Sequence, residues 1–595
     1  MAAQHPSTDP KGRRVEEYVA VAALVASALC ALALSWRKWP DPIADVGHQL
    51  YTAWRLAQGA VLYRDVGCLY GPFSSYLNAL LFRVFGPGMM VLVAANLTVY
   101  FAIAGLAYRL FRAAYGTGVA VAVLAVFVWV FSFNQLMGLP NYTYALPYAH
   151  ESTHGLLVSL ALILAASRWI AGPRIVHALV LGLLCGLAFV IKPEFMLVSA
   201  LVVGSAVFVR IRMGRPPRAI EIACAGVAWM TPTALFTIYF WQRLALAAAF
   251  SAANQAWWPV VVNHVSAHIW ASFSGTDAVL HNLTKLASAT AVLALALGVM
   301  WVGARFALRG VRLAVVLIAV PSAIALAYAD WMLAAWCVPL TLLAVLGSHI
   351  VKTVRDPAAQ SPLGLLLASA AFALLVRMFL HPRFFHFGFY QAALATMVVL
   401  AEILSLLRQF AGQHKLARLV LHVSAGFMVV AACLAIFLPS ARSYSRRTFP
   451  VGSGRDRFFA LAPARDPSGS LDRQVVDELR RLPPDDTVLV VPEGLMINYL
   501  ARRKSPLPEW VFIDLTLAGP AEAALVQRLA ASPPAVVVYL HRELGEHGIS
   551  QWGDPGQPGY LMLKFFQQNY RPRLSLAGNP ADPNRPGALI LARAP

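Results

Sequence analysis

The chain has 595 residues, of which 59% are hydrophobic and only 13% are charged. Soluble domains carry about 25% charged residues, so this composition excludes an ordinary soluble protein and predicts a chain embedded in a lipid bilayer. The formal net charge is +20. Basic residues gather at the cytoplasmic ends of membrane spans, so we interpret this charge as an insertion signal and predict no nucleic-acid partner.

Apolar runs of about 20 residues, the length that crosses a bilayer as a helix, recur up to residue 438. They predict a polytopic α-helical membrane protein with about 13 transmembrane helices, a membrane domain over 1–438 and a soluble domain over 439–595. In two places, consecutive spans are separated only by a short polar break, and the predicted number of spans depends on whether each break is counted as a boundary. The spans are 16–36, 88–108, 115–133, 150–167, 175–191, 195–209, 219–240, 286–304, 312–328, 332–350, 362–380, 385–406 and 417–438.

Basic residues in every second connection predict the orientation of the chain. They place the N-terminus in the cytoplasm and, with an odd number of spans, the tail outside. A chain rich in Ala, Arg, Leu, Val and Pro is typical of a bacterial source, so we expect the inner membrane and a periplasmic tail. The basic connections are 11–14, 109–112, 168–174, 210–218, 305–312, 352–355 and 408–418.

The first external loop, residues 37–87, carries the most distinctive motif, Asp45-Val46-Gly47-His48. From Asp45 to Gly59 the spacing of apolar residues predicts an amphipathic helix at the membrane interface. Asp45 would stand at its start, where a carboxylate either caps the helix or is available as a base. A second segment, Phe73–Phe85, is too short to cross the bilayer and is expected to lie along its surface.

Basic residues also lie near the external ends of later spans. Ionisable groups at this depth usually face a cavity, and Lys and Arg bind phosphate groups. Each has a structural alternative: Lys192 could reach the interface, Arg377 could pair with Glu194 or Asp330, and the others could belong to an aromatic interfacial belt. The predicted phosphate-binding residues are Lys192, Arg377, Arg383, His381 and His386.

The second external connection, residues 134–149, and the start of the following span are polar and aromatic. Such side chains suit sugar hydroxyls, and they suit ordinary loop packing equally well. Glu151 and His154 stand three residues apart on one helix face, which leaves a divalent cation open as a cofactor. The predicted substrate-binding residues of this region are Tyr142, Tyr144, His150 and Glu151.

The tail changes in composition after Pro439, with more Pro, Arg and Asp and with apolar residues in short blocks. Strands that alternate with helices predict a small α/β domain. No Gly-rich phosphate loop opens a helix there, so we predict no nucleotide and expect a scaffold or an acceptor-docking role. The predicted strands are Thr487–Val491, Val511–Asp514, Ala535–Leu540 and Ala588–Ala592, and the predicted helices are Glu522–Ala530 and Leu561–Asn569.

The order of motifs in the first loop resembles that of GT-C glycosyltransferases. After Asp45-x-Gly47 come Tyr63-Arg64-Asp65, Tyr70-Gly71-Pro72 and Leu81-Phe82-x-x-Phe85-Gly86. The pattern is most similar to the bacterial branch related to protein O-mannosyltransferases and lipid A aminoarabinose transferases. Two later segments, Gly182–Glu194 and Phe387–Tyr390, and the plan of about 13 spans before an external domain also look like this family.

The resemblance implies transfer of a sugar from a polyprenyl-phosphate donor to a hydroxyl acceptor outside the cytoplasm. It implies that Asp45 is the catalytic base, and we add the motif residues Asp65 and Tyr70 to the predicted substrate-binding set. Many members carry a second acid after the first, whereas this chain has Val46, which leaves the involvement of a metal open. The acceptor, whether protein, lipid or cell-envelope glycan, is not identified.

General chemistry agrees with this assignment. A single-displacement sugar transfer needs one carboxylate to take the acceptor proton and cations to stabilise the departing phosphate. A dedicated general acid is less necessary than in glycoside hydrolysis, because phosphate is already a good leaving group. A transporter or flippase of a lipid-linked sugar is the alternative, although the duplicated, Gly/Pro-interrupted spans expected of that class are not found in the sequence. A lipid-sugar polymerase or ligase of envelope polysaccharide is a closer competitor.

Overall fold

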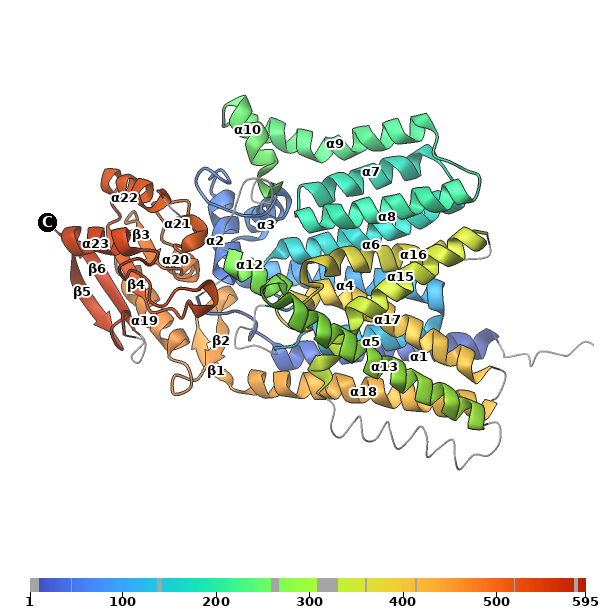
Figure 1. Cartoon of the computed structure of the whole chain (residues 1–595). Coiled ribbons are helices and arrows are strands. Elements are labelled where there is room, and N and C mark those ends of the chain that lie inside the picture. The colour runs from blue at the N-terminus through green and yellow to red at the C-terminus, as the bar shows by residue number, and fades with distance from the viewer. Residues whose placement is uncertain are drawn as a thin grey trace, which may run out of the picture.

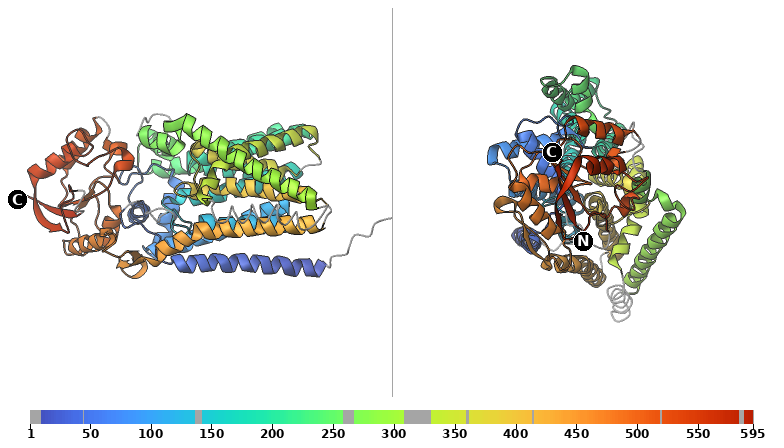
Figure 2. Two further views of the ribbon diagram at one scale, coloured as in Figure 1. Left: turned by 60° about the horizontal axis from the view of Figure 1, so that its bottom comes forward. Right: turned by 90° about the vertical axis from the view of Figure 1, so that its left-hand side faces the viewer.

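A computed structural model of the chain describes residues 10–43, 45–135, 142–257, 267–307, 330–358, 361–412, 415–517, 520–582 and 587–594. Long helices run side by side in a bundle, and a smaller unit of strands and short helices lies at one end of it (Figure 1). Both views in Figure 2 agree with this arrangement. The membrane part and the tail are therefore stacked along the direction of the helices.

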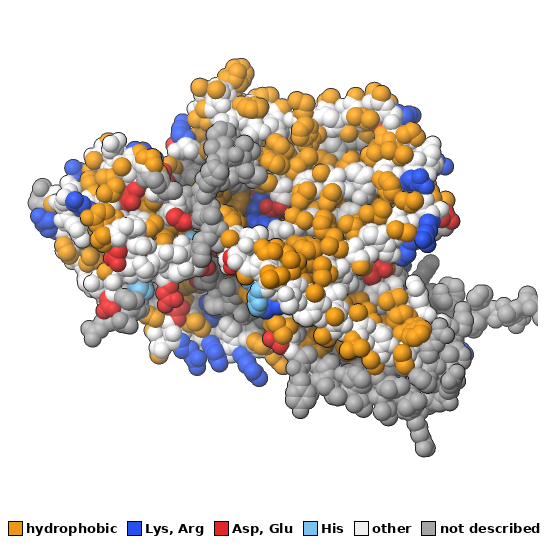
Figure 3. Space-filling view, viewed as in Figure 1, with side chains coloured by type: hydrophobic (Ala, Val, Ile, Leu, Met, Phe, Trp, Pro, Cys, Tyr) orange, Lys and Arg blue, Asp and Glu red, His pale blue; other side chains and the backbone are white. Residues whose placement is uncertain are grey.

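Nine helices in the described part of the chain are long and apolar enough to cross a membrane, and three shorter apolar helices accompany them. Hydrophobic side chains dominate the visible surface of the bundle, as expected for a surface that faces lipid (Figure 3). The predicted span 312–328 lies outside the described residues, so the total of about 13 stays a prediction. The bundle contains α1 (Pro10–Ser35), α4 (Met89–Tyr115), α5 (Thr117–Val126) with η1 (Phe127–Ser132), α6 (His150–Ala171), α7 (Ile175–Phe189), α8 (Pro193–Arg212), α9 (Ala219–Trp241), α13 (Val279–Ala307), η4 (Trp331–Cys337) with α15 (Val338–Arg355), α16 (Pro362–Leu375) with η5 (Val376–Met378), α17 (Gly388–Ala411) and α18 (Lys415–Ser445).

The last bundle helix, α18, continues past the predicted end of the membrane domain at residue 438. Pro439 lies inside this helix, and the helix ends only at Ser445. The change in composition at Pro439 therefore does not coincide with the end of the helix, and strand β1 follows directly at Arg447.

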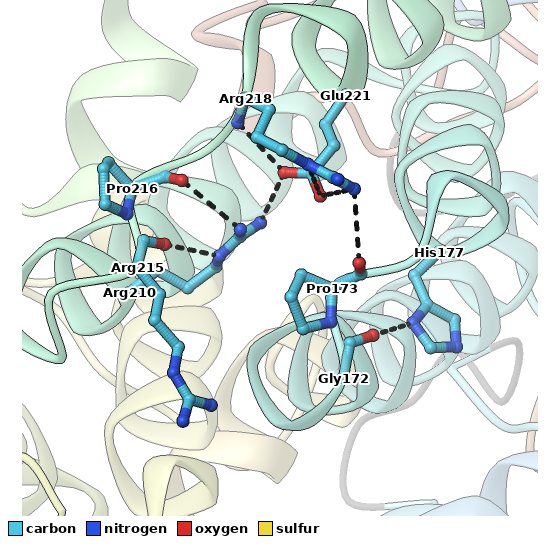
Figure 4. Close-up of polar contacts among 8 residues, drawn as sticks. All are labelled: Gly172, Pro173, His177, Arg210, Arg215, Pro216, Arg218 and Glu221. Carbon is cyan, nitrogen blue, oxygen red and sulfur yellow. Dashed lines mark hydrogen bonds and ion pairs between the residues drawn. The ribbon is translucent and has the colours of Figure 1, made fainter.

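A buried ion-pair cluster fastens the connection between α8 and α9, at the end of the bundle away from the tail (Figures 1 and 4). The carboxylate of Glu221 is fully buried and accepts from Arg210 at 2.9 Å and from Arg218 at 3.1 Å. Arg210 also donates to the backbone carbonyl of Arg215, and Arg218 donates to that of Pro173 in the neighbouring connection. These arginines, which the sequence predicts to be cytoplasmic, thus hold helix ends together as well.

The first external loop folds into α2 (Val46–Ala57) and α3 (Pro72–Phe85), which lie between the bundle and the tail (Figure 1). The prediction of an interfacial helix is wrong for α2, because it packs against α3 and against α20 (Leu495–Ala501) of the tail and even its polar residues Gln49 and Thr52 are buried. Gly47 permits the contact with α20: a Cβ atom there would lie 2.2 Å from the backbone nitrogen of Met496.

Helix α3 has two unlike faces. Polar residues such as Ser74 and Asn78 are buried, whereas Leu80, Val84 and Phe85 are exposed. An exposed apolar stripe on a short helix fits the predicted position along the membrane surface.

The tail is built around a mixed four-stranded sheet in the order β3-β4-β6-β5, in which only β3 and β4 are parallel. Successive residues of β4 point to opposite faces and all are buried, so the sheet is covered on both sides. Its elements are β1 (Arg447–Val451), η6 (Gly454–Asp456), β2 (Phe458–Leu461), α19 (Ser468–Arg480), β3 (Val488–Val491), α20 (Leu495–Ala501), α21 (Asp514–Leu517), α22 (Ala521–Ala531), β4 (Val536–Leu540), η7 (Gly545–His547), α23 (Tyr560–Asn569), β5 (Tyr570–Leu576) and β6 (Ala588–Arg593).

Most predicted elements of the tail are present, since β3, β4, β6, α22 and α23 match predicted segments. The predicted strand Val511–Asp514 is wrong: Val511 makes one isolated β-bridge to Glu493, and α21 begins at Asp514. This segment was not distinguishable from a strand by its composition, because a short apolar run has no helical period.

One hydrophobic core joins the bundle, the first loop and the tail. The ring of Tyr499 in α20 stacks on that of Phe82 in α3, with centroids 6.4 Å apart. The carboxylate of Asp456 accepts from the backbone N–H of Met89 at 2.7 Å and from the Tyr499 hydroxyl at 2.9 Å. The tail is thus seated on the first loop, and the candidate site lies between them.

Candidate active site

A cavity of about 210 Å³ lies between the membrane part and the tail. The first loop, the segment around residue 142, α12 (Ala267–Ser274), the segment before α17 and the tail all contribute to its wall. Convergence of polar groups from several elements in one hollow is typical of a ligand-binding site. The polar and aromatic residues of the wall include Asp45, His48, Tyr70, Tyr142, Tyr148, Trp270, His386, Phe387, Glu493, Trp510, Arg542, Glu546 and His547.

Asp45 lies on this wall, immediately before α2. Its side chain makes no capping hydrogen bond to the helix, so the structural alternative for this residue does not hold. Burial raises the pKa of the Tyr70 and Tyr142 hydroxyls well above the usual value, and the nearby charge of Asp45 raises both further. Asp45 thus lines the same cavity as these two phenols.

His48 connects the first loop to the tail. Its Nε2 atom lies 2.9 Å from the carbonyl oxygen of Gly67, and its ring stacks on Trp510 with centroids 5.2 Å apart. Burial lowers the pKa of His48 to about 4, although the hydrogen bond to Gly67 opposes this shift. The imidazole is therefore neutral at pH 7, and Nε2–H donates to the carbonyl.

Lys192 is buried behind the cavity wall rather than extended to the membrane interface. Its ammonium lies 2.9 Å from the Glu194 carboxylate, donates to the hydroxyls of Tyr148 and Tyr390 at 3.2 Å, and stands 4.8 Å from the ring centre of Tyr70. Burial alone would lower the pKa of Lys192, but Glu194 outweighs it and holds this pKa above the usual value. The lysine is cationic and already paired.

Arg377 is placed differently from Lys192. Its guanidinium stacks on Trp270 at 4.2 Å and on Phe387 at 4.9 Å, and both rings line the cavity. Within the described part of the chain it makes no hydrogen bond and no close ion pair, although the charge of Glu194 acts on it from nearby, as the predicted alternative of pairing with this residue implies. Its N–H groups are available to an anion beside the cavity.

His386 lies on the wall and is only 6% exposed, and its Nδ1 atom has no hydrogen-bond partner among the described residues. Burial, together with Arg383 and Arg377, holds the pKa of His386 well below its usual value. It therefore offers hydrogen bonds rather than positive charge at neutral pH. Arg383 lies beside it and donates to the carbonyl of Phe273 at 3.3 Å, with its Nε buried and without a partner in the described regions.

His381 is turned away from the cavity. Its Nδ1 lies 3.0 Å from the carbonyl oxygen of Ser272, and its ring packs against Trp336. The cavity wall does not include it. Of the five predicted phosphate-binding residues, Arg377 and Arg383 thus combine a charge with donors beside the cavity.

The tail contributes charged residues that the sequence prediction missed. Glu493 follows β3 and Arg542 follows β4, and Arg542 Nε donates to the Glu493 carboxylate at 2.7 Å. Glu546 and His547 in η7 complete this side of the wall. Ligands often bind beyond the carboxyl ends of adjacent parallel strands, so a signal was present in the sequence. The expectation of a scaffold or an acceptor-docking role for the tail named none of these residues.

A second cavity, of about 230 Å³, lies inside the bundle and is almost entirely apolar. Helices α13, α17 and α18 line it with side chains such as Leu297, Leu400 and Val429. Phe384 borders this apolar cavity, whereas His386 and Phe387, two and three residues later, border the polar one. One short segment therefore separates a hydrocarbon-like space from a polar space.

Comparison with known proteins gives a fold. No family model matches the sequence, and no curated protein matches it. ArnT from Cupriavidus metallidurans, solved with undecaprenyl phosphate, superposes with a TM-score of 0.50 at 11% identity, over 96% of this chain and 97% of ArnT. Apo ArnT gives the same score and identity over 97% and 98%. The chain has the GT-C fold of ArnT.

An oligosaccharyltransferase from Archaeoglobus fulgidus, solved with zinc and sulfate, also aligns, with a TM-score of 0.48 at 13% identity over 87% of this chain and 67% of that protein. The match to ArnT confirms, at the level of the fold, the resemblance that the first-loop motifs suggested. A mostly helical membrane part with a small α/β tail is the common plan with ArnT.

Four of the predicted substrate-binding residues are not on the wall of the polar cavity in this GT-C fold. They are held by local contacts instead. Tyr144 donates to the carbonyl of Phe389 at 3.1 Å, and His150 lies between two asparagine amides. Glu151 accepts from Gln49 at 3.4 Å, and Asp65 pairs with Arg64 and accepts from the backbone N–H of Val61. Tyr70 and Tyr142 do line the cavity.

The described residues contain no group of three or more His, Cys, Asp or Glu side chains that could hold a metal ion. The helix pair Glu151 and His154 is used internally, since His154 lies 2.9 Å from the Ser74 hydroxyl.

Proposed function

We propose that the protein is a membrane glycosyltransferase that moves a sugar from a polyprenyl-phosphate donor to a hydroxyl acceptor. The observation that carries the proposal is the position of Asp45 on the wall of the polar cavity. Arg377 stacks on Trp270 and Phe387 of the same wall, and Phe384, three residues before Phe387, borders an apolar cavity in the bundle. A base, a cation and a hydrocarbon-like space are the three features that such a reaction requires.

The two cavities suit the two parts of the donor. The isoprenoid chain would occupy the apolar cavity, and the phosphate would lie near Arg377 and Arg383, at the segment that separates the cavities. Arginine binds phosphate through two parallel hydrogen bonds, which a stacked guanidinium is already oriented to make. The binding of undecaprenyl phosphate by ArnT supports this assignment.

The reaction would be an inverting single displacement. The acceptor oxygen attacks the anomeric carbon while Asp45 takes its proton, and the bond between that carbon and the phosphate oxygen breaks. The electron pair of this bond stays on the phosphate, whose charge Arg377 stabilises as polyprenyl phosphate leaves. Asp45 returns its proton to water after release.

The decisive experiment measures free polyprenyl phosphate by mass spectrometry after the purified full-length protein is incubated with a panel of polyprenyl-phosphate sugars and a cell-envelope extract. Asp45→Asn and Arg377→Gln are tested beside it. Exposed Asp485 in the tail provides a matched control, Asp485→Asn, which makes the same chemical change away from the cavity. We expect donor-dependent release that falls at least about 100-fold in Asp45→Asn and is unchanged in Asp485→Asn.

Each other outcome has a defined meaning. Release that survives Asp45→Asn would keep the transferase and reject the base. Donor binding without release under any condition would favour the alternative, a transporter or flippase of the lipid-linked sugar, which could use the same two cavities.

We further propose that the chain lies in the bacterial inner membrane with residues 439–595 as a periplasmic domain and the N-terminus in the cytoplasm. The buried basic cluster around Arg210, at the end of the bundle opposite the tail, supports this orientation through the positive-inside rule. Alkaline phosphatase fused after the tail should be active, and green fluorescent protein fused there should be dark.

A further inference from the structure

We infer that the tail side of the polar cavity binds a neutral carbohydrate, so that the acceptor of the proposed transferase is a glycan hydroxyl. The inference rests on the proposed function for its role as acceptor, while binding itself can be tested independently. It assigns Glu493, Arg542 and Glu546 as the residues that select the acceptor.

The cavity brings a tail carboxylate and the proposed base to one space. Glu546 lies in η7, which follows β4, and Asp45 lies before α2, yet both line the same cavity as Tyr142. Burial is the largest cause of the raised pKa of Tyr142, with Asp45 and Glu546 adding to it. A ligand that reaches Asp45 therefore also reaches Glu546.

The charge of this wall favours a neutral, hydroxyl-rich ligand. The tail contributes two carboxylates to it, those of Glu493 and Glu546, and the guanidinium of Arg542 is already paired with that of Glu493. Carboxylates only accept hydrogen bonds, and the hydroxyls of a sugar ring are donors that match them. A phosphate-bearing acceptor would be repelled by the same carboxylates. The aromatic rings of the wall, such as Tyr142 and Trp510, offer apolar surface to the C–H groups of a sugar.

A second, independent observation points to a hydrogen-bonding ligand in the cavity. His386 lies on the wall and is only 6% exposed, and its Nδ1 lacks a partner within the described residues. A buried polar atom without a partner is unfavourable unless a ligand or water completes it. A sugar hydroxyl can donate to or accept from this nitrogen, whichever tautomer is present.

A protein acceptor is the competing class. A serine or threonine side chain presents one hydroxyl, whereas the cavity offers carboxylate acceptors from Asp45, Glu493 and Glu546 together. A sugar ring carries several hydroxyls and can therefore donate hydrogen bonds to more of these carboxylates than one serine or threonine can. The observations therefore favour a glycan, and the peptide becomes an outcome of the test.

The experiment probes the detergent-solubilised full-length protein on an array of neutral oligosaccharides, phosphorylated oligosaccharides and Ser/Thr peptides, without donor. Saturation-transfer NMR in solution confirms each hit. The variants are Glu546→Gln, at an exposed side chain that should not affect folding, and Arg542→Gln, whose folding is checked by thermal unfolding. Glu543→Gln is the matched control: it lies in the same connection, is exposed and does not line the cavity.

We expect one or more neutral oligosaccharides to bind, with affinity at least about tenfold weaker in Glu546→Gln and unchanged in Glu543→Gln. Binding confined to peptides or to phosphorylated sugars, or neutral-sugar binding that Glu546→Gln leaves unchanged, would overturn the inference. Absence of binding to all three probe classes would overturn it as well. Neutral-sugar binding lost in Glu546→Gln without any donor turnover would reject the transferase and keep the carbohydrate site. Donor-dependent transfer to a peptide would keep the transferase and reject the carbohydrate site.

Discussion

At the residue scale, the pair of Lys192 and Glu194 has a structural and a catalytic interpretation. Lys192 is 4% exposed and is bonded to Glu194 and two tyrosine hydroxyls. Removal of one partner of a buried ion pair leaves an uncompensated charge and typically costs about 3–5 kcal/mol. We therefore expect Lys192→Met and Glu194→Gln each to lower the free energy of unfolding by that amount, measured by thermal and denaturant unfolding in detergent.

The double variant separates the two interpretations. Lys192→Met/Glu194→Gln removes both charges and should recover part of the lost stability, because neither member of the pair is left without the other, although Arg377 then lacks the nearby charge of Glu194. If Lys192 only supports the wall, donor turnover should recover together with stability. If the lysine also binds the donor phosphate, turnover should stay low in a well-folded double variant.

His48 makes stability depend on pH. Its pKa is about 4 in the folded protein, whereas an unperturbed histidine has a pKa of about 6.5. Between these values the unfolded chain binds a proton that the folded chain does not, so the free energy of unfolding falls as the pH is lowered from 6.5 to 4. We expect His48→Gln, whose amide can still donate to Gly67, to remove about 1–3 kcal/mol of this loss.

Unfolding midpoints measured from pH 7.5 to 4.5 would check this expectation. The same substitution at exposed His422 on α18 is the control and should leave the pH profile of the native protein unchanged. Identical pH profiles of the unfolding midpoint for the native protein and His48→Gln would show that protonation of the stacked imidazole does not destabilise the folded protein.

At the element scale, sequence patterns predicted the elements whose environment is simple. Long apolar spans such as α1 and α4 and short buried strands such as β3 and β4 are recognisable because hydrophobic residues fill them continuously. The environment of α2 was not predictable, because a helix buried between two units has the same amphipathic spacing as one on a membrane surface. Strands β1 and β2, which are short and only partly buried, and β5, which exposes many residues, also lacked a clear pattern.

Gly47 decides how closely α2 approaches the tail. A Cβ atom there would meet the backbone of Met496 at 2.2 Å, and backbone cannot move aside as a flexible side chain can. We expect Gly47→Ala to lower the free energy of unfolding by about 1–3 kcal/mol through overpacking and to reduce donor turnover, because Asp45 lies two residues away. Gly105→Ala on α4, where no atom lies within 4 Å of the added Cβ, should change neither unfolding nor turnover.

At the scale of the whole molecule, the candidate site belongs to neither part alone. Asp45 comes from the membrane part, whereas Glu493, Arg542 and Glu546 come from the tail, more than 440 residues later in the sequence. The first-loop motif was sufficient to single out Asp45. The tail residues could not be placed beside it, because nothing local in the sequence encodes the docking of α20 on α2 and α3.

The common core implies that the tail and the first loop open together. Tyr499 joins them, because its ring stacks on Phe82 of α3, its hydroxyl donates to Asp456, and Arg502 lies over its face at 4.0 Å. Tyr499→Ala should cost about 3–5 kcal/mol, as for other large buried aromatic residues.

Tyr499 does not line the cavity, but its removal should affect both the first-loop side and the tail side of the cavity. We expect faster hydrogen exchange in Tyr499→Ala not only in α20 but also in α2 and α3, together with reduced donor turnover, because the position of Asp45 relative to the tail is no longer fixed. Tyr560→Ala, at an exposed position on α23, should change neither quantity. Faster exchange confined to the tail would mean that the two walls are independent, and that the cavity forms by simple contact rather than by cooperative folding.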